Sequence, residues 1–108
     1  MISKKRATEI EKMIAKVLNM LAVIGSGNTP HDKEDIKNDK YLGQIKATDT
    51  MKGNFNLLDL NKLERNSIKA NKIPLMIIHF EREELINSTW VSMPIQCFKE
   101  MSDKIDKD

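Results

Sequence analysis

A chain of 108 residues that is 40% apolar and 31% charged fits one folded domain over residues 1–108, and it is too apolar for a disordered protein. Its single cysteine, Cys97, excludes an intramolecular disulfide, and its apolar runs are too short to cross a bilayer, so we expect a cytoplasmic protein without membrane contact. The net charge of +2 neither demands nor excludes a nucleic-acid partner.

The first part of the chain predicts a helix followed by short extended segments. Apolar residues spaced by three and four predict a helix over residues 8–19. The apolar run 21–24 favours a short strand, which Gly25-Ser26-Gly27 would end. Residues 28–40 are polar and contain Pro30, so we expect a loop that includes a short extended piece at Asp35-Ile36.

The second part of the chain predicts strands on either side of a helix. Residues 41–48 read as a strand, and residues 57–71 as a helix with Asn56 or Asp59 as its cap. The apolar run 74–80 is typical of a strand buried on both faces, and 89–93 predicts another strand. Residues 96–107 suit a short amphipathic helix. The connection from 41–48 to 74–80 is long enough for a parallel crossover, so we expect an α/β fold with a mixed sheet.

Several kinds of catalytic centre are excluded by composition. One cysteine with His31 and His79 does not supply a metal–thiolate site. His79 lies in an apolar strand, where a hydrogen-bonded structural histidine is a better interpretation than a catalytic base. The Gly25-Ser26-Gly27 turn lacks the residues of a Walker loop or a dinucleotide fingerprint, although its amides could face a phosphate.

The remaining constellation consists of Asp35 and a strand that carries Gln44, Ile45 and Lys46. Because side chains alternate along a strand, Gln44 and Lys46 share one face, which is either a solvated edge or a site. A carboxylate, an amide oxygen and a main-chain carbonyl can hold Mg²⁺ together with several waters. Such an ion assists phosphodiester hydrolysis, and a nearby lysine can orient the attacking water and stabilise developing charge.

These residues, in this order, resemble a known nuclease motif. Asp35…Gln44-Ile45-Lys46 resembles the motif of the PD-(D/E)XK nuclease superfamily, with glutamine in the second acidic place. The surrounding segments 25–27, 33–36 and 41–48 are similar to the archaeal and phage branch of Holliday junction resolvases. A basic helix, an apolar strand and a last strand with Trp90 extend the likeness over residues 8–94.

The resemblance implies a restriction-endonuclease-like, three-layer α/β/α fold with a mixed central sheet. It also implies a homodimeric endonuclease that uses Mg²⁺ or Mn²⁺ on branched or duplex DNA and leaves 5′-phosphates. A helix acid completes the family's site, and it falls on Glu11, with Glu9 as the competitor. The implied catalytic residues are Glu11, Asp35, Gln44 and Lys46, and the implied metal ligands are Glu11, Asp35, Gln44 and the carbonyl of Ile45.

Two questions stay open at this point. The basic residues at the N-terminus and along the helix 57–71 are either solvated faces or phosphate contacts. Glutamine carries no charge, so Gln44 is compatible with a nuclease that still cuts, a weak or non-catalytic DNA-binding module, or a deliberate substitution. A nuclease of linear duplex is a further alternative. The candidate DNA contacts are Lys4, Lys5, Arg6, Ser26, Thr48, Lys62, Arg65 and Lys69.

Overall fold

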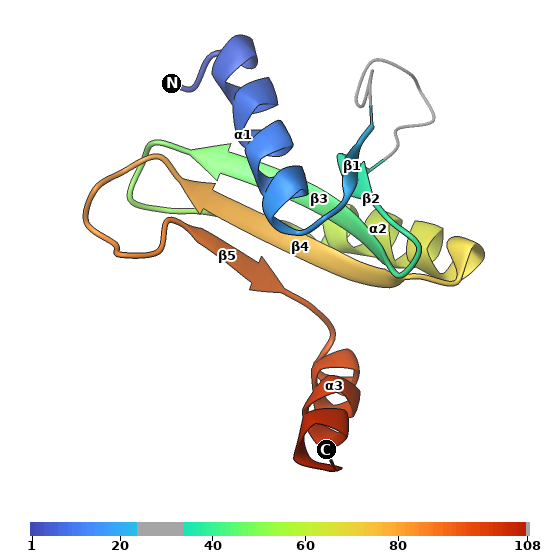
Figure 1. Ribbon diagram of the computed structural model, residues 1–108. Helices are drawn as coiled ribbons and strands as arrows, with labels where there is room; N and C mark the ends of the chain where they lie inside the picture. The colour runs from blue at the N-terminus through green and yellow to red at the C-terminus, as the bar shows by residue number, and fades with distance from the viewer. Residues whose placement is uncertain (24–33, 108) are drawn as a thin grey trace.

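The computed structural model describes residues 1–23 and 34–107, and Figure 1 shows how their helices and strands are arranged. The predicted Gly25-Ser26-Gly27 turn, with its phosphate-contact candidate Ser26, lies outside the described residues. Within the described ranges, no helix has the length and apolar character needed to span a membrane. The elements in chain order are α1 (Lys4–Val17), β1 (Leu21–Ala22), β2 (Ile36–Lys37), β3 (Tyr41–Thr48), α2 (Leu57–Ala70), β4 (Ile73–Phe80), β5 (Thr89–Ser92) and α3 (Ile95–Lys107).

The described strands form one mixed sheet in the order β1-β2-β3-β4-β5. β3 and β4 pair in parallel along their whole length, from Tyr41↔Ile73 to Thr48↔Phe80, and α2 makes the crossover between them. The other neighbouring strands pair antiparallel. The prediction of an α/β fold with a mixed sheet and a parallel crossover is therefore confirmed.

Helices α1 and α2 pack on opposite faces of the sheet. On one face, Ile10 and Ile14 of α1 join a buried cluster with strand residues that include Ile45 and Ile77. On the other face, Leu63 of α2 packs against Leu42 and Met76, whose side chains alternate with those of the first cluster. This arrangement is compatible with a three-layer α/β/α fold. In Figure 1, α3 stands apart from these layers.

Both long helices begin where a polar side chain caps them. α1 begins at Lys4, four residues before the predicted start, because the Ser3 hydroxyl accepts a hydrogen bond from the Arg6 amide at 3.1 Å. α2 is capped by Asn56, whose Oδ1 accepts from the Asp59 amide at 2.8 Å, so Asn56 rather than Asp59 is the cap. Asn71 adopts a left-handed conformation, with φ of 57°, and ends α2.

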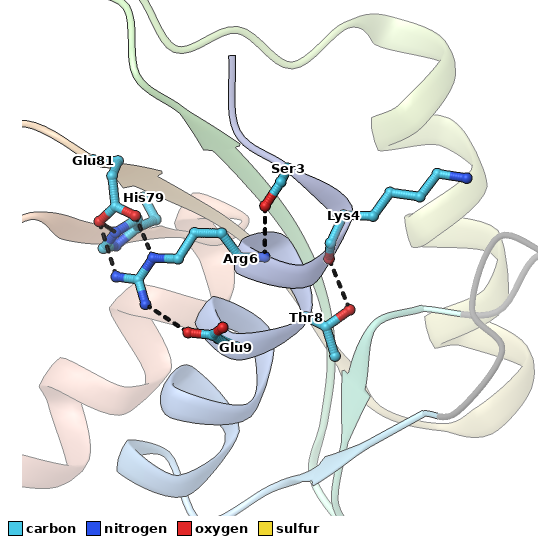
Figure 2. Close-up of polar contacts among 7 residues, drawn as sticks. All are labelled: Ser3, Lys4, Arg6, Thr8, Glu9, His79 and Glu81. Atoms are coloured by element: carbon cyan, nitrogen blue, oxygen red, sulfur yellow. Dashed lines mark hydrogen bonds and ion pairs between the residues drawn. The ribbon is translucent and has the colours of Figure 1, made fainter.

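A polar network ties the first turn of α1 to the far end of β4 (Figure 2). The Arg6 guanidinium forms two hydrogen bonds with the Glu81 carboxylate and a third with Glu9 at 3.3 Å. Arg6 holds the pKa of Glu81 well below its usual range, at about 2. Beneath them, buried His79 lies 2.7 Å from the Thr89 hydroxyl and 3.3 Å from Glu81. His79 is therefore the hydrogen-bonded structural histidine that the sequence favours.

The close approach of β2 to β3 depends on Gly43. Gly43 pairs with Ile36, a residue that is completely buried. A Cβ atom at position 43 would lie only 2.7 Å from the Cγ1 atom of Ile36, well inside van der Waals contact. The absence of a side chain at Gly43 thus lets β2 lie flat against β3.

Candidate active site

Asp35 is held against β3 by its own side chain. It is the residue before β2, and the antiparallel register Ile36↔Gly43 places it opposite Gln44. Its Oδ2 atom accepts a hydrogen bond from the Ile45 amide at 2.8 Å and another from Gln44 Nε2 at 3.1 Å. The side chain is only 6% exposed, so these bonds offset much of the cost of burying its carboxylate. The structure thus brings Asp35, Gln44 and Ile45 together.

Glu11 is the acid of α1 that meets Asp35. The pKa of Glu11 is raised to about 7, mostly by burial, and the nearby charge of Asp35 and a hydrogen bond with its carboxyl group also contribute to this rise. Glu9 points elsewhere, since it pairs with Arg6. Between the two acids that the sequence left in competition, only Glu11 shows an interaction with the Asp35 carboxyl group.

Gln44 meets Asp35 through the nitrogen of its amide. Because Nε2 donates the bond to Asp35, the amide oxygen points away from that carboxylate. The amide would have to turn over before its oxygen could face the same space as the Asp35 carboxylate. In the described arrangement, Gln44 acts as a neutral donor that stabilises the buried charge of Asp35.

Lys46 is drawn toward the first turn of α2. Its Nζ atom lies 3.1 Å from Oδ2 of Asp59, and both side chains are partly exposed. Strand alternation places Lys46 on the same face of β3 as Gln44. The sequence predicted Asp59 only as a possible helix cap and did not predict that it pairs with Lys46. An acidic residue in the first turn of the helix that follows a lysine-bearing strand was the available signal.

One side of α2 runs along the site and carries two of the predicted basic residues. Residues 59, 62, 66 and 69 are spaced by three and four, so they lie on one side of the helix. Asp59 binds Lys46, and Asn66 donates a 2.7 Å hydrogen bond to Glu34, the neighbour of Asp35. Lys62 and Lys69 are exposed and lie on the same side of α2 as Asp59 and Asn66. They therefore border the site.

The other predicted DNA contacts differ in how they are engaged. Lys4 and Lys5 are exposed, and Figure 2 shows the Lys4 side chain extending away from the Arg6 network. The guanidinium of Arg6 is occupied by Glu81 and Glu9, which leaves it less able to contact a phosphate. Arg65 is exposed on α2, and the Thr48 hydroxyl lies 2.8 Å from that of Thr50.

Among the residues that the structure describes, the carboxylates of Glu11 and Asp35 meet at the site beside other oxygen donors. Among residues 1–23 and 34–107, no group of three or more His, Cys, Asp or Glu is arranged to hold a metal ion. A cation at Glu11 and Asp35 would need further oxygens from the Gln44 amide, the Ile45 carbonyl or water. Such an all-oxygen set suits Mg²⁺ or Mn²⁺. A carboxyl pair with one raised pKa also fits, because a divalent cation would offset both the burial of charge and the repulsion by Asp35 that raise this pKa.

Comparisons of the chain with protein-family models, with curated proteins and with solved structures find no match.

Proposed function

We propose that this chain is a metal-dependent endonuclease of the Holliday-junction-resolvase type, built on a restriction-endonuclease-like fold and acting in the cytoplasm as a homodimer. The observation that carries the proposal is the meeting of Glu11 with Asp35, while Asp35 binds Gln44 and the Ile45 amide. A carboxyl group whose pKa is raised by burial and by a neighbouring carboxylate is typical of functional sites, and this supports the proposal.

Each residue of the site has a role in this proposal. Glu11 and Asp35 would hold the cation, and the Ile45 carbonyl and, once the amide has turned over, the Gln44 oxygen would be the remaining protein donors. When bound, the cation supplies charge neutralisation at the scissile phosphate and lowers the pKa of the attacking water. Lys46 leaves Asp59 when DNA arrives, orients the water and stabilises negative charge on the phosphate.

The basic side of α2 explains how DNA would reach the site. Lys62 and Lys69 border the site from α2, and a backbone lying along that helix would meet both before it reached Lys46. Phosphate contacts of this kind position DNA without reading its sequence. Arg65, Lys4 and Lys5 extend this basic surface in the proposal, and Thr48 supplies a hydroxyl at the end of β3.

The direct test is cleavage of an immobile four-way junction in Mg²⁺ and in Mn²⁺. We expect cleavage by the unaltered chain and its loss in Lys46→Ala, with junction binding retained. Lys16→Ala, which removes an exposed lysine at the end of α1, is the matched control and should cut normally. Undiminished cutting by Lys46→Ala would sink the assignment. A linear duplex of the same sequence separates a resolvase from a general nuclease.

A second function, a DNA-binding module without catalysis, is favoured by one observation. The Gln44 amide already donates to Asp35, so that carboxylate is satisfied without a cation. This alternative predicts junction binding without cleavage in either metal. It also predicts that Gln44→Glu, which adds a third carboxylate, gains Mn²⁺ affinity measurable by calorimetry and acquires cutting activity.

A further inference from the structure

Helix α3 presents an apolar stripe that no part of the described chain covers. Ile95, Phe98 and Ile105 are spaced by three and seven, so they lie on one side of the helix, and they are 84%, 61% and 73% exposed. None of the α3 side chains that the structure describes is buried or belongs to either core cluster. Figure 1 shows α3 projecting from the body of the protein. A soluble helix of this pattern normally packs against something.

An apolar pocket of about 380 Å³ opens where α3 leaves the sheet. It exists because α2 packs over β3 and β4 and leaves the same face of β5 uncovered. Trp90 is 56% exposed and shares this face of β5 with Ser92, so it extends the apolar surface beyond the pocket. Leu60 and Leu63 of α2, Pro74 and Met76 of β4, and Ser92 and Pro94 are among the residues that line the pocket.

The helix of the same molecule is badly placed to fill this pocket. Only Met93 and Pro94 join β5 to α3, and both of them line the pocket. The Pro94 carbonyl accepts hydrogen bonds from the amides of Cys97 and Phe98, so the helix is already wound at the rim. Met93 is also held extended by the proline that follows it. The connection is therefore short, and it leaves little length for α3 to fold back and place Phe98 in the pocket of its own chain.

We propose that the pocket receives α3 of a second copy of this chain, and that each copy gives its helix to the other. The apolar stripe of α3 and the pocket lie next to each other in one molecule. The stripe has no surface to pack against, and the pocket has no side chains to fill it. A two-fold axis makes such a contact twice, with the same residues on both sides. The inference rests on these surfaces alone and stands whether or not the chain cuts DNA.

The area available matches what a stable dimer needs. At 56% and 61% exposure, Trp90 and Phe98 each present on the order of 100–150 Å². With Ile95, Met101, Ile105 and the pocket walls, each copy offers roughly 600 Å² or more, so the dimer would bury about 1,200 Å² in total, at the lower end of stable interfaces. Helix exchange is the arrangement that covers both surfaces at once.

A charge-pair experiment tests the exchange specifically. Phe98→Lys places a cation on the helix stripe, and Leu60→Glu places an anion on the pocket wall, where Leu60 is 37% exposed. In a mixed dimer, the altered helix of one copy meets the altered pocket of the other, and the second contact is unaltered. In the homodimer of either variant, an unpaired charge is buried at both contacts. In the mixed dimer the two introduced charges face each other instead, so each variant should pair with the other rather than with itself. Val17→Lys alters an exposed apolar residue at the end of α1, away from both surfaces, and serves as the control.

Analytical ultracentrifugation of the full chain reads out the result. We expect the unaltered chain and Val17→Lys to sediment at twice 12.4 kDa. Phe98→Lys and Leu60→Glu alone should each weaken dimerisation by about tenfold or more, and their mixture should restore it. Far-UV circular dichroism of each variant checks that it is folded.

Other outcomes overturn the proposal. A monomeric unaltered chain across the accessible concentrations would mean that α3 is covered by another partner or by its own body. Dimerisation that Phe98→Lys weakens and Leu60→Glu leaves unchanged would mean that α3 pairs with α3. Iodide quenching of Trp90 on dilution gives an independent measurement, because exchange protects Trp90 in the dimer and exposes it in the monomer.

Discussion

The Glu11–Asp35 pair should make the stability of this chain fall as the pH rises toward neutrality. In the folded protein the pKa of Glu11 is about 7, above its usual 4.5. Below its usual pKa the carboxyl group is protonated in both the folded and the unfolded chain. Above the folded value it must ionise beside Asp35, so the favourable contribution of the protonated form is lost as the pH passes 7.

The magnitude follows from the difference between the two pKa values. A rise from 4.5 to about 7 corresponds to about 3 kcal/mol at 1.36 kcal/mol for each pKa unit. Glu11 is only partly buried, and solvent screening reduces this to about 1–2 kcal/mol. Glu11→Gln keeps a donor for Asp35 and cannot ionise. The variant should therefore exceed the unaltered chain in stability by about 1–2 kcal/mol at about pH 8, with little difference near pH 4.5.

Urea denaturation in the presence of a chelator, at about pH 5 and about pH 8, measures this difference. Glu9→Gln is the matched control, because Glu9 pairs with Arg6 and does not contribute to the Glu11 pKa. Parallel pH profiles for Glu11→Gln and the unaltered chain would refute the reasoning. Replacing the chelator with Mg²⁺ at the higher pH should stabilise the unaltered chain more than the variant, since a cation offsets the repulsion.

Three further predictions concern the packing of the sheet. Ile77→Ala empties a fully buried position and should cost about 2–5 kcal/mol in urea denaturation, whereas Val91→Ala on β5, 45% exposed, should cost below about 0.5 kcal/mol; similar losses at both would contradict the described core. Ser67→Ala removes a buried hydroxyl for which the described chain provides no hydrogen-bond partner, so thermal unfolding should show unchanged stability or a gain of up to about 1 kcal/mol, and a clear loss would reveal an unseen partner. Glu81→Gln should destabilise the chain above about pH 4.5, and this deficit should vanish as the pH falls toward 2, because Arg6 depresses the pKa of Glu81; a deficit that persists in acid would exclude the ion pair as its cause.

Sequence patterning located the elements that carry their own signal. The strand Tyr41–Thr48 was predicted with its observed bounds, because alternation and turn residues mark both ends. The helix ends were less accurate. The predicted start of α1 at residue 8 missed the Ser3 cap, and the last helix begins at Ile95, directly after a proline, rather than at residue 96.

The candidate site was only partly accessible to sequence reasoning. That reasoning placed Gln44 and Lys46 on one strand face, which depends on local alternation alone. It did not find the Lys46–Asp59 ion pair, because that contact forms only when the crossover returns α2 over β3. Nor did it indicate that the Gln44 nitrogen faces Asp35, since the orientation of an amide depends on its neighbours in space. The sequence also did not predict that α3 would project from the sheet. An amphipathic pattern predicts a helix with an apolar side but does not identify what packs against that side.

Gly43 gives this protein an uneven tolerance to change around its candidate site. Any side chain at position 43 would push Ile36 outward, and Ile36 carries Asp35 with it along the chain. The next residue, Gln44, is only partly buried, and a glutamate there would have nearly the same size and shape. In a random mutagenesis experiment, we therefore expect folded variants that change the charge of the site. We expect almost none that change the distance between β2 and β3. A lineage of variants selected for new activity would keep Gly43 and change Gln44.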